Sequence, residues 1–276
     1  MTVAARPLRD VGILITRPVG QGETLKARFE AKGAEVLHFP TIEILPVERS
    51  PELDRALTQL DSYSYAIFIS PNAVEYAAHY IDLATLPSTL KVAAIGPGTA
   101  RALTARGRKP DMLPRDGANS EALLRLKALN RVEGKRVLIV RGLGGRELLA
   151  ETLEERGADV EYAEVYRRSV PRLDQAELTQ WFRQGKVDAI AVTGRDALLN
   201  LERMLSPALT PYFKAAQLLV PSARMVKLAS ALGVRRRPLI AGEATDSALV
   251  NTMVSWWASH GREQRKHRRE NERSAG

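Results

Sequence analysis

Residues 134–168 read GKRVLIVRGLGGRELLAETLEERGADVEYAEVYRR, and this stretch decides the fold. It contains a buried apolar strand, a glycine turn, an amphipathic helix and a second strand. Residues 13–36 repeat residues 137–160 at a constant offset of 124, with ten identities in 24 ungapped positions. The identities include Arg17 with Arg141, Gly20 with Gly144, Glu23 with Glu147 and Gly33 with Gly157. The repeat predicts two copies of one domain.

A second pair of segments repeats farther along the chain. Residues 65–70 resemble residues 188–193 at an offset of 123, so the two kinds of segment alternate. The second segment continues through a predicted helix that ends at residue 129, and the third segment begins at Lys135. Only residues 130–134 separate them, a length typical of a loop inside one α/β domain. Extended stretches separate the other segments, so we place the domain crossings there. We predict a discontinuous first domain at 1–39 and 171–260, a second domain at 47–163, connectors at 40–46 and 164–170, and a disordered basic tail at 261–276.

The alternation of strands and helices also predicts the fold class. Parallel strands need crossover connections and are apolar on both faces, as the predicted strands here are. We therefore expect two similar α/β domains with parallel sheets, of the flavodoxin or Rossmann type. The two connectors can pair as a two-stranded antiparallel β-ribbon. Ligands of such sheets bind beyond the carboxyl ends of the strands, so a shared ligand would lie in a cleft between the domains.

Composition excludes several chemistries. The chain has no cysteine and four histidines, none of them at i,i+4 spacing, so a disulfide, a thiolate nucleophile or a zinc site is not expected. No signal peptide or membrane span is evident, and we predict a cytoplasmic protein. Of the net charge of +9, the tail carries +3, because six lysines and arginines face three acids there. The dispersed remainder of +6 suits a small polyanionic ligand as well as it suits nucleic acid.

Polar side chains follow the predicted strand ends. Hydroxyls, glycines and arginines dominate this set, which binds an anion more obviously than it cleaves a bond. Its members are Thr16, Arg17, Ser70, Asn72, Thr99, Arg141, Gly142, Arg146, Thr193 and Ser222, with Tyr166 on the second connector. The serines and threonines also suit helix caps, and the arginines suit a solvated rim. Tyr166 either packs the connector or places a proton-donating phenol at the cleft edge.

The glycine turn at residues 142–145 invites comparison with a dinucleotide-binding loop. The fingerprint G-x-G-x-x-G/A needs a small residue at its third conserved position, and Glu147 occupies that position here. A nicotinamide or flavin site is therefore not expected. No G-x-x-x-x-G-K-[ST] motif is present to indicate a nucleoside triphosphate.

Short motifs in a fixed order connect the chain to a known family. They are Ile-Thr-Arg-Pro at 15–18, His-Phe-Pro at 38–40, Ile-Ser-Pro-Asn-Ala-Val at 69–74, Ala-Ile-Gly at 94–96, Leu-Ile-Val-Arg-Gly at 138–142 and Val-Tyr-Arg at 165–167. In order and spacing the chain resembles the bacterial uroporphyrinogen-III synthases. The resemblance implies two α/β domains joined by a two-stranded ribbon, and a lyase that cyclises hydroxymethylbilane with inversion of ring D and loss of water.

The resemblance also implies roles and partners. Tyr166 would assist departure of the hydroxyl, and Ser70, Thr99, Thr193 and Ser222 would line the cleft. No cofactor and no metal are expected. The partner would be the small-molecule substrate, with a transient contact to the preceding pathway enzyme, and the protein would be a monomer that binds neither nucleic acid nor membrane.

Two other classes of protein remain open on the sequence. One is a non-catalytic two-domain binding protein for a small anionic ligand, and the other is a two-domain glycosyltransferase. An anchor segment or an attached helix-turn-helix would favour the first, and a nucleotide-sugar signature would favour the second. None of these is visible in the sequence.

Overall fold

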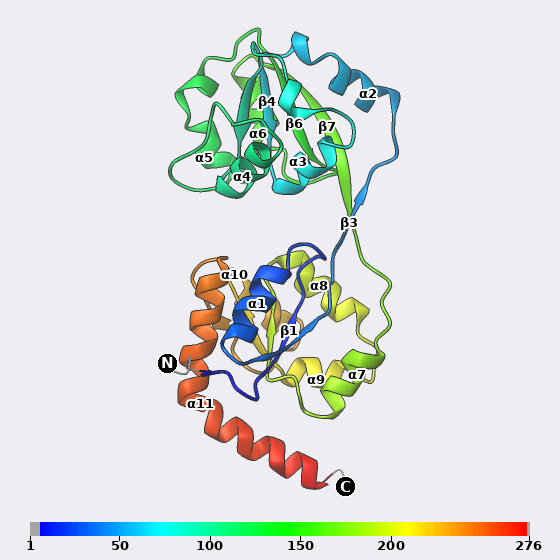
Figure 1. Cartoon of the computed structure of the whole chain (residues 1–276), viewed down its shortest axis with the longest axis vertical. Helices are drawn as coiled ribbons and strands as arrows, with labels where there is room; N and C mark the ends of the chain where they lie inside the picture. Colours follow the sequence, from blue (N-terminus) through cyan, green and yellow to red (C-terminus); the bar gives the residue numbers. More distant parts are fainter. Residues whose placement is uncertain (1–5, 275–276) are drawn as a thin grey trace. The chain divides into compact units, whose positions relative to one another are not determined.

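The structure is a computed structural model that describes the backbone of residues 6–274 and the side chains of residues 6–261. The chain divides into two compact units (Figure 1). Unit 1 comprises Met1–Glu43 and Ser169–Gly276, and unit 2 comprises Ile44–Arg168.

Unit 1 is built on a five-stranded sheet with the order β10-β9-β8-β1-β2. Its strands are β1 (Gly12–Ile15), β2 (Glu35–His38), β8 (Ala189–Ala191), β9 (Gln217–Val220) and β10 (Leu239–Ile240). All four neighbouring pairs are parallel. Parallel strands need crossover connections, which usually contain helices. The helices before the last strand are α1 (Glu23–Ala31), α7 (Ala176–Arg183), α8 (Arg195–Met204), α9 (Thr210–Ala215) and α10 (Arg224–Ala231), and α11 (Asp246–Ser274) follows that strand.

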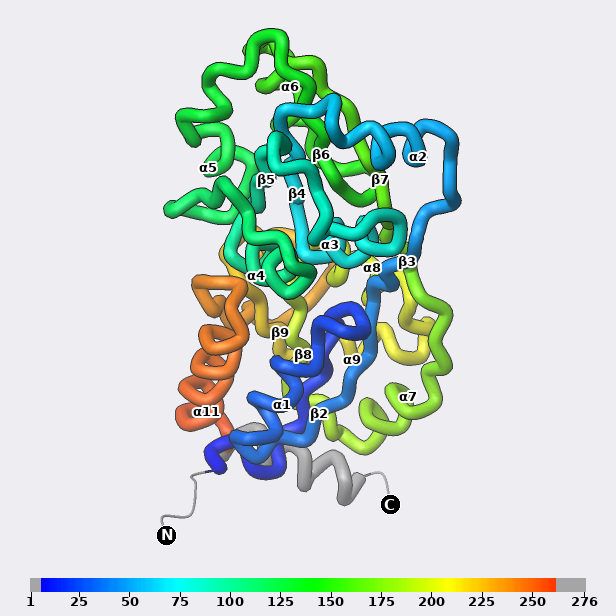
Figure 2. The backbone as a smooth tube through the Cα atoms, turned by 45° about the horizontal axis from the view of Figure 1, so that its top comes forward, coloured from blue at the N-terminus to red at the C-terminus, as the bar shows by residue number. Residues whose placement is uncertain are grey.

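Both faces of the unit 1 sheet are buried. Ile13 and Ile15 of β1 pack with Phe29 of α1 and Met253 of α11. Leu14 points to the other face, where α7, α8, α9 and α10 supply the core. Helix α11 lies beside α1 in both views (Figures 1 and 2). The continuous apolar run of β1 thus reflects a strand covered on both sides.

Unit 2 repeats this architecture with the strand order β3-β7-β6-β4-β5. Its strands are β3 (Glu43–Pro46), β4 (Tyr65–Phe68), β5 (Lys91–Ala94), β6 (Arg136–Gly142) and β7 (Asp159–Ser169). The pairs β4–β5, β4–β6 and β6–β7 are parallel. Its helices are α2 (Pro51–Thr58), α3 (Pro71–Ala77), α4 (Pro97–Ala105), α5 (Ser120–Leu124) and α6 (Leu148–Glu155), with 3₁₀ turns at Leu60–Ser62, Leu83–Thr85 and Lys127–Asn130. The predicted fold class, two parallel-sheet α/β domains, is confirmed.

The elements near the predicted connectors differ in detail from the sequence expectation. Strand β7 runs without interruption through Asp159–Ser169, so most of the predicted second connector at 164–170 is strand. Valine and tyrosine in this segment favour a pleated, half-buried position, which is consistent with its extension. Strand β3 occupies the sheet edge next to β7. The antiparallel ribbon stays a prediction.

Two helices of unit 2 are short. Helix α3 ends at Ala77, and α5 ends at Leu124 before a separate 3₁₀ turn. The tail at 261–276 was predicted to be disordered, whereas α11 continues through it as far as Ser274. Arginine, lysine, glutamine and glutamate, which are frequent in this tail, have good helix propensity. The side chains beyond Gly261 and residues 275–276 lie outside the described residues. In the part of the chain that the structure describes, no helix combines the length and apolar character that a membrane span requires.

Candidate active site

The carboxyl ends of the unit 2 strands bring several predicted site residues to one edge. Phe68 at the end of β4 lies opposite Ala94 of β5 and Val140 of β6, and Gly142 lies opposite Tyr166 of β7. Parallel strands place the residues that follow them at the same side of the sheet. Ser70, Thr99, Gly142 and Tyr166 therefore lie at the same edge of the unit 2 sheet.

Ser70 begins helix α3 and also contacts Tyr166. Its backbone is extended, and its Oγ accepts a hydrogen bond from the backbone N–H of Ala73 at 3.0 Å. Pro71 at the first helical position suits this cap, because proline has no N–H to satisfy. The same Oγ lies 3.1 Å from the hydroxyl of Tyr166. Ser70 is thus a cap, as its residue type favours, and at the same time a partner of the phenol.

Tyr166 is almost completely buried, with 1% of its surface exposed. Its ring lies 5.7 Å from the ring of Tyr76, centroid to centroid. Arg168 donates from Nη2 to the phenolic oxygen at 3.2 Å, and its Cζ lies 5.5 Å from the ring centroid. A guanidinium only donates, so this bond leaves the phenol's own proton available to Ser70 or to another acceptor.

Gly142 makes room for the Tyr166 ring. A Cβ at this position would lie 2.5 Å from Cε2 and Cζ of Tyr166. Only a residue without a side chain fits beside the ring. Close packing against Tyr166 therefore explains the glycine at position 142. From the sequence, Gly142 was expected to contact the substrate.

Arg141 lies at the same edge but faces inward, contrary to the expectation that it offers its guanidinium to a ligand. Its side chain is 2% exposed, and Nη1 donates to both carboxylate oxygens of Glu147, at 3.2 and 3.3 Å. Nε donates to the carbonyl oxygen of Gly142 at 3.2 Å and lies 3.7 Å from Oε1 of Glu164. A buried cation needs such partners, and the carboxylates that satisfy it come from the protein itself.

Tyr162 completes the surroundings of Arg141. The guanidinium carbon lies 4.5 Å from the centroid of the Tyr162 ring, and the Tyr162 hydroxyl donates to Glu147. That hydrogen bond and the nearby Arg141 hold the pKa of Glu147 below its usual value. Burial and the Glu147 carboxylate raise the pKa of Tyr162 to about 12. At neutral pH the group is thus an arginine cation, a carboxylate and a neutral phenol.

Arg146 is the more exposed of the two predicted arginines in unit 2. Its Nη2 donates to Oε1 of Glu121 at 2.5 Å, and 65% of its side chain is exposed. This bond, together with the charge on Arg146, lowers the pKa of Glu121. An exposed ion pair is weakly held, so Arg146 can exchange this partner for a ligand at low cost.

The remaining predicted residues of unit 2 lie in the first turns of α3 and α4. Asn72 is half-buried in α3, and Thr99 is 2% exposed in α4. A Cβ on Gly98 would lie 3.5 Å from Cγ of Pro71, so the two first turns are close neighbours. No side chain caps α4, whose N-cap is Gly96. The amides of its first turn therefore have no side-chain acceptor at the N-cap.

Unit 1 has an equivalent edge that gathers Arg17, Thr193 and Ser222. Ile15, Ala191 and Leu219 are neighbours in the sheet, and these three residues follow the corresponding strand ends. Nη1 of Arg17 donates to Oδ1 of Asp246 at 2.6 Å, so this arginine is also paired internally. Thr193 precedes Gly194, the N-cap of α8, and no side chain caps that helix. The carbonyl of Ser222 accepts the N–H of Met225, which starts the turn into α10.

Sequence reasoning missed the residues that organise these edges. Glu147, Glu164 and Asp246 neutralise the predicted arginines, and Arg168 contacts the phenol. A signal was present for Glu147 alone, because the repeat pairs it with Glu23. The other contacts join elements that sequence spacing does not relate.

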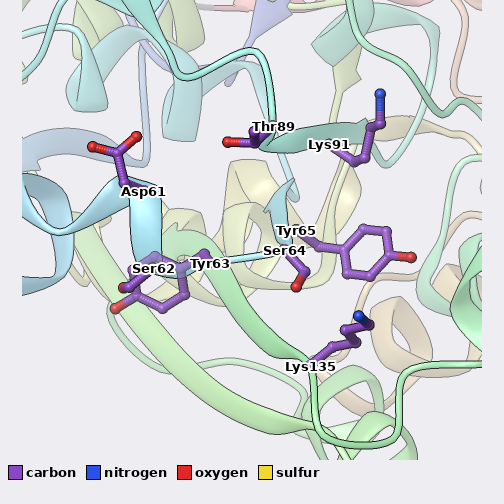
Figure 3. Close-up of a pocket in the computed structure, with 8 residues that line it drawn as sticks. All are labelled: Asp61, Ser62, Tyr63, Ser64, Tyr65, Thr89, Lys91 and Lys135. Atoms are coloured by element: carbon purple, nitrogen blue, oxygen red, sulfur yellow. The ribbon is translucent and has the colours of Figure 1, made fainter.

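A pocket of about 360 Å³ lies elsewhere in unit 2 (Figure 3). Its lining includes Tyr65, Lys91 and Lys135, which stand at the amino-terminal ends of β4, β5 and β6. Figure 3 shows the two lysines on either side of the Tyr65 ring. The predicted site residues follow the opposite ends of these strands. Within the described residues, no group of three or more histidine, cysteine, aspartate or glutamate residues could hold a metal ion.

Comparisons with known proteins agree over nearly the whole chain. The family described as uroporphyrinogen-III synthase HemD matches residues 23–251. The uroporphyrinogen-III synthase of Escherichia coli is 34% identical over 246 residues, which cover 88% of this chain and 100% of that protein. The Salmonella typhimurium protein of the same name is 36% identical over 252 residues, with coverage of 88% and 100%.

A solved structure supports the fold independently. A mutant uroporphyrinogen III synthase from the extremely thermophilic bacterium Thermus thermophilus superimposes with a TM-score of 0.59 at 19% identity. The superposition covers 91% of this chain and 99% of that one. At this identity the likeness shows the fold, and the sequence matches above show the family. The chain therefore belongs to the uroporphyrinogen-III synthase family.

Proposed function

We propose that this chain is a lyase that cyclises hydroxymethylbilane to uroporphyrinogen III, with inversion of ring D and loss of water. The observation that carries the proposal is the match to the Escherichia coli enzyme, which extends over 100% of that protein at 34% identity. A non-catalytic binding protein is not favoured, because the two relatives whose whole length matches 88% of this chain carry the name of the synthase.

Loss of the hydroxyl is the step in which a protein proton donor helps. The C–O bond of the hydroxymethyl group breaks, and the oxygen leaves as water with a proton from a general acid. We assign this role to Tyr166, whose phenol lies beside Ser70 at the carboxyl edge of unit 2. The substituted carbon of the last pyrrole then attacks the resulting azafulvenium cation, and a spiro intermediate rearranges. The proton that this pyrrole loses on closure restores the phenol, so atoms and charge balance.

The eight carboxylates of the bilane need hydrogen-bond donors on the protein. Arg17 and Arg141 are paired with Asp246, Glu147 and Glu164, so their guanidinium groups are already satisfied. The uncapped first turn of α4 offers main-chain N–H groups at Thr99, and the uncapped first turn of α8 begins at Arg195, directly after Thr193 and the N-cap Gly194. We assign carboxylate binding to these amides, with Ser70, Asn72, Arg146 and Ser222 as further contacts.

The assay supplies freshly made hydroxymethylbilane, oxidises the products and separates the porphyrin isomers. We expect isomer III in excess with the protein, and isomer I in the protein-free control, where the bilane closes spontaneously without inversion. The chain would have another function if only isomer I formed at every protein concentration. The cytoplasmic location, the monomeric state, the absence of a cofactor and the contact with the preceding enzyme stay predictions.

Ser70 and Ser50 form a matched pair that separates capping from contact with the phenol. Both have extended backbone, precede a proline and accept an N–H three residues later, from Ala73 and Leu53 respectively. Ser70→Ala and Ser50→Ala should each lower the free energy of unfolding by about 1 kcal/mol. Only Ser70→Ala should also lower kcat, by about fivefold, because one neutral hydrogen bond to the phenol is lost. Denaturant titrations and steady-state kinetics of both variants check this, and equal kcat values would remove Ser70 from the site.

A further inference from the structure

The buried guanidinium of Arg141 is the central group of an ionic cluster beside the proposed acid. We call Arg141, Glu147, Tyr162 and Glu164 the arginine cluster. Nη1 of Arg141 binds Glu147 and Nε binds the Gly142 carbonyl, so two donors of one rigid fork point to different parts of the chain. Tyr162 covers the guanidinium face at 4.5 Å. No substrate group is needed to satisfy this arginine.

The arginine cluster holds the glycine loop at residues 142–146 at one end through the Gly142 carbonyl, in the middle through Gly144, and at the other end. Glu164 on β7 accepts the backbone N–H of Gly144 at 3.2 Å, next to Nε of Arg141. Glu147 immediately precedes α6 and therefore fixes the other end of the loop. Gly145 has a φ of +119°, and a Cβ there would lie 3.2 Å from Nη2 of Arg141. The loop thus wraps closely around the guanidinium.

The same loop holds Tyr166. The backbone N–H of Leu143 donates to the carbonyl oxygen of Tyr166 at 2.7 Å. Gly142, whose carbonyl accepts from Arg141, lies against the Tyr166 ring. A continuous path of contacts therefore leads from Arg141 through Gly142 and Leu143 to the phenol.

Lysine cannot reproduce this arrangement. An ammonium is a compact point charge, whereas the planar guanidinium reaches a carboxylate and a carbonyl at once and stacks on an aromatic ring. The fully buried position also makes each lost partner expensive. Exchange of Arg141 for lysine should keep the charge and loosen the loop.

We propose that Arg141 is a positioning residue, whose guanidinium fixes the glycine loop and through it the place of the Tyr166 hydroxyl. The effect on turnover rests on the proposed function of Tyr166, whereas the effect on the place of the ring does not. In the repeat, the counterpart of Arg141 is Arg17. Within the described residues, Arg17 forms an ion pair with one carboxylate, that of Asp246.

Strand β6 itself provides a matched control. Arg136 begins the strand, pairs with Glu161 and Asp159 at 3.0 and 3.3 Å, and lies 4.5 Å over the ring of Tyr63. It therefore has the same kinds of partner as Arg141, at the end of the strand that is remote from Tyr166. Arg141→Lys and Arg136→Lys thus differ in location and in burial, because 35% of the Arg136 side chain and 2% of the Arg141 side chain is exposed.

The first measurement is structural and needs no substrate. With 3-fluorotyrosine labelling, the fluorine resonance of Tyr166 is assigned by its loss in Tyr166→Phe. Arg141→Lys should shift or broaden this resonance, and Arg136→Lys should leave it in place. An unchanged Tyr166 resonance in folded Arg141→Lys would overturn the proposal, whatever reaction the protein catalyses.

The second measurement is kinetic. Arg141→Lys should lower kcat about tenfold with KM within about twofold, a smaller effect than the roughly 100-fold that a 1 Å misplacement causes. Arg136→Lys should leave both constants within about twofold. In a Tyr166→Phe background, Arg141→Lys should cause little further loss of kcat, because both changes act on the same hydroxyl.

Three results would contradict the proposal. A raised KM with unchanged kcat in Arg141→Lys would make Arg141 a substrate contact. Equal losses of kcat in Arg141→Lys and Arg136→Lys would indicate general destabilisation. Independent losses of kcat in the variant that combines Arg141→Lys with Tyr166→Phe would show that Arg141 does not act through the phenol. If Arg141→Lys does not fold, Glu147→Gln replaces it, because the Glu147 side chain is half-exposed and its exchange disturbs the core less. Glu147→Gln should also shift the fluorine resonance of Tyr166, and an unchanged resonance would contradict the proposal. A shifted resonance in a protein that forms no isomer III would reject the proposed function and leave the positioning role intact.

Discussion

Replacement of Tyr166 by phenylalanine is expected to lower kcat about 100-fold, at the lower end of the range for loss of general acid catalysis. KM should change by less than about twofold, because the hydroxyl acts on the leaving group and does not bind the carboxylates. Steady-state rates of isomer III formation, measured over a range of hydroxymethylbilane concentrations, give both constants. The prediction separates a role in the reaction from a role in binding.

The physical reason lies in the hydrogen bonds of the phenol. Arg168 donates to the Tyr166 oxygen at 3.2 Å, which favours developing negative charge there. Ser70 lies 3.1 Å from the same oxygen and already accepts the N–H of Ala73. The phenolic proton can therefore pass to a substrate hydroxyl without leaving Ser70 unbonded. Phenylalanine keeps the buried ring and removes only the hydroxyl.

Tyr76 provides the matched control for this variant. Its ring lies 5.7 Å from that of Tyr166, and its hydroxyl donates to the carbonyl of Ile44 at 2.7 Å. Tyr76→Phe should lower the free energy of unfolding by about 1 kcal/mol and leave kcat in place. Wild-type turnover in Tyr166→Phe would remove the tyrosine from the chemistry, and so would an equal loss in Tyr76→Phe.

The fold class was predictable because its signals are local and repeated. The glycine turns, the apolar strands and the offset of 124 residues determine a strand-turn-helix-strand unit without knowledge of distant contacts. Element ends were less predictable. Strand β7 continues to Ser169 because it pairs with β6 and borders β3, and that neighbourhood depends on the whole sheet.

The site was predictable as a set of strand ends but not as a set of side-chain directions. Arg141 and Arg17 do lie at equivalent strand ends, as the repeat indicated. Their guanidinium groups face Glu147, Glu164 and Asp246, and Asp246 is 229 residues away from Arg17 in the chain. Residue type and spacing cannot tell whether a cation meets a ligand or an internal carboxylate. The burial of Arg141, at 2% exposure, answers that question.

Replacement of Gly142 by alanine is expected to lower both stability and turnover. The new Cβ would lie 2.5 Å from two carbon atoms of the Tyr166 ring, and the ring cannot swing away freely because it is 1% exposed and packed near Tyr76. Overpacking of this kind lowers the free energy of unfolding by about 1–3 kcal/mol. Because the clash displaces the phenol itself, kcat should fall about 100-fold, the loss that a 1 Å misplacement causes.

Gly134 shows what alanine costs on the same strand without a clash. It precedes β6 at the far end, has a φ of +65°, and a Cβ there would meet nothing within 4 Å. Gly134→Ala should cost about 1 kcal/mol of backbone strain and leave kcat unchanged. Gly142 has no positive φ, so alanine is compatible with its backbone and the steric contact with Tyr166 is the dominant cause of any loss. Thermal unfolding and kcat of the two variants, measured side by side, therefore test whether the ring must stay where Gly142 allows it. Full turnover in folded Gly142→Ala would show that the reaction tolerates a displaced phenol, and Tyr166 would then lose its assigned role together with the loop that holds it.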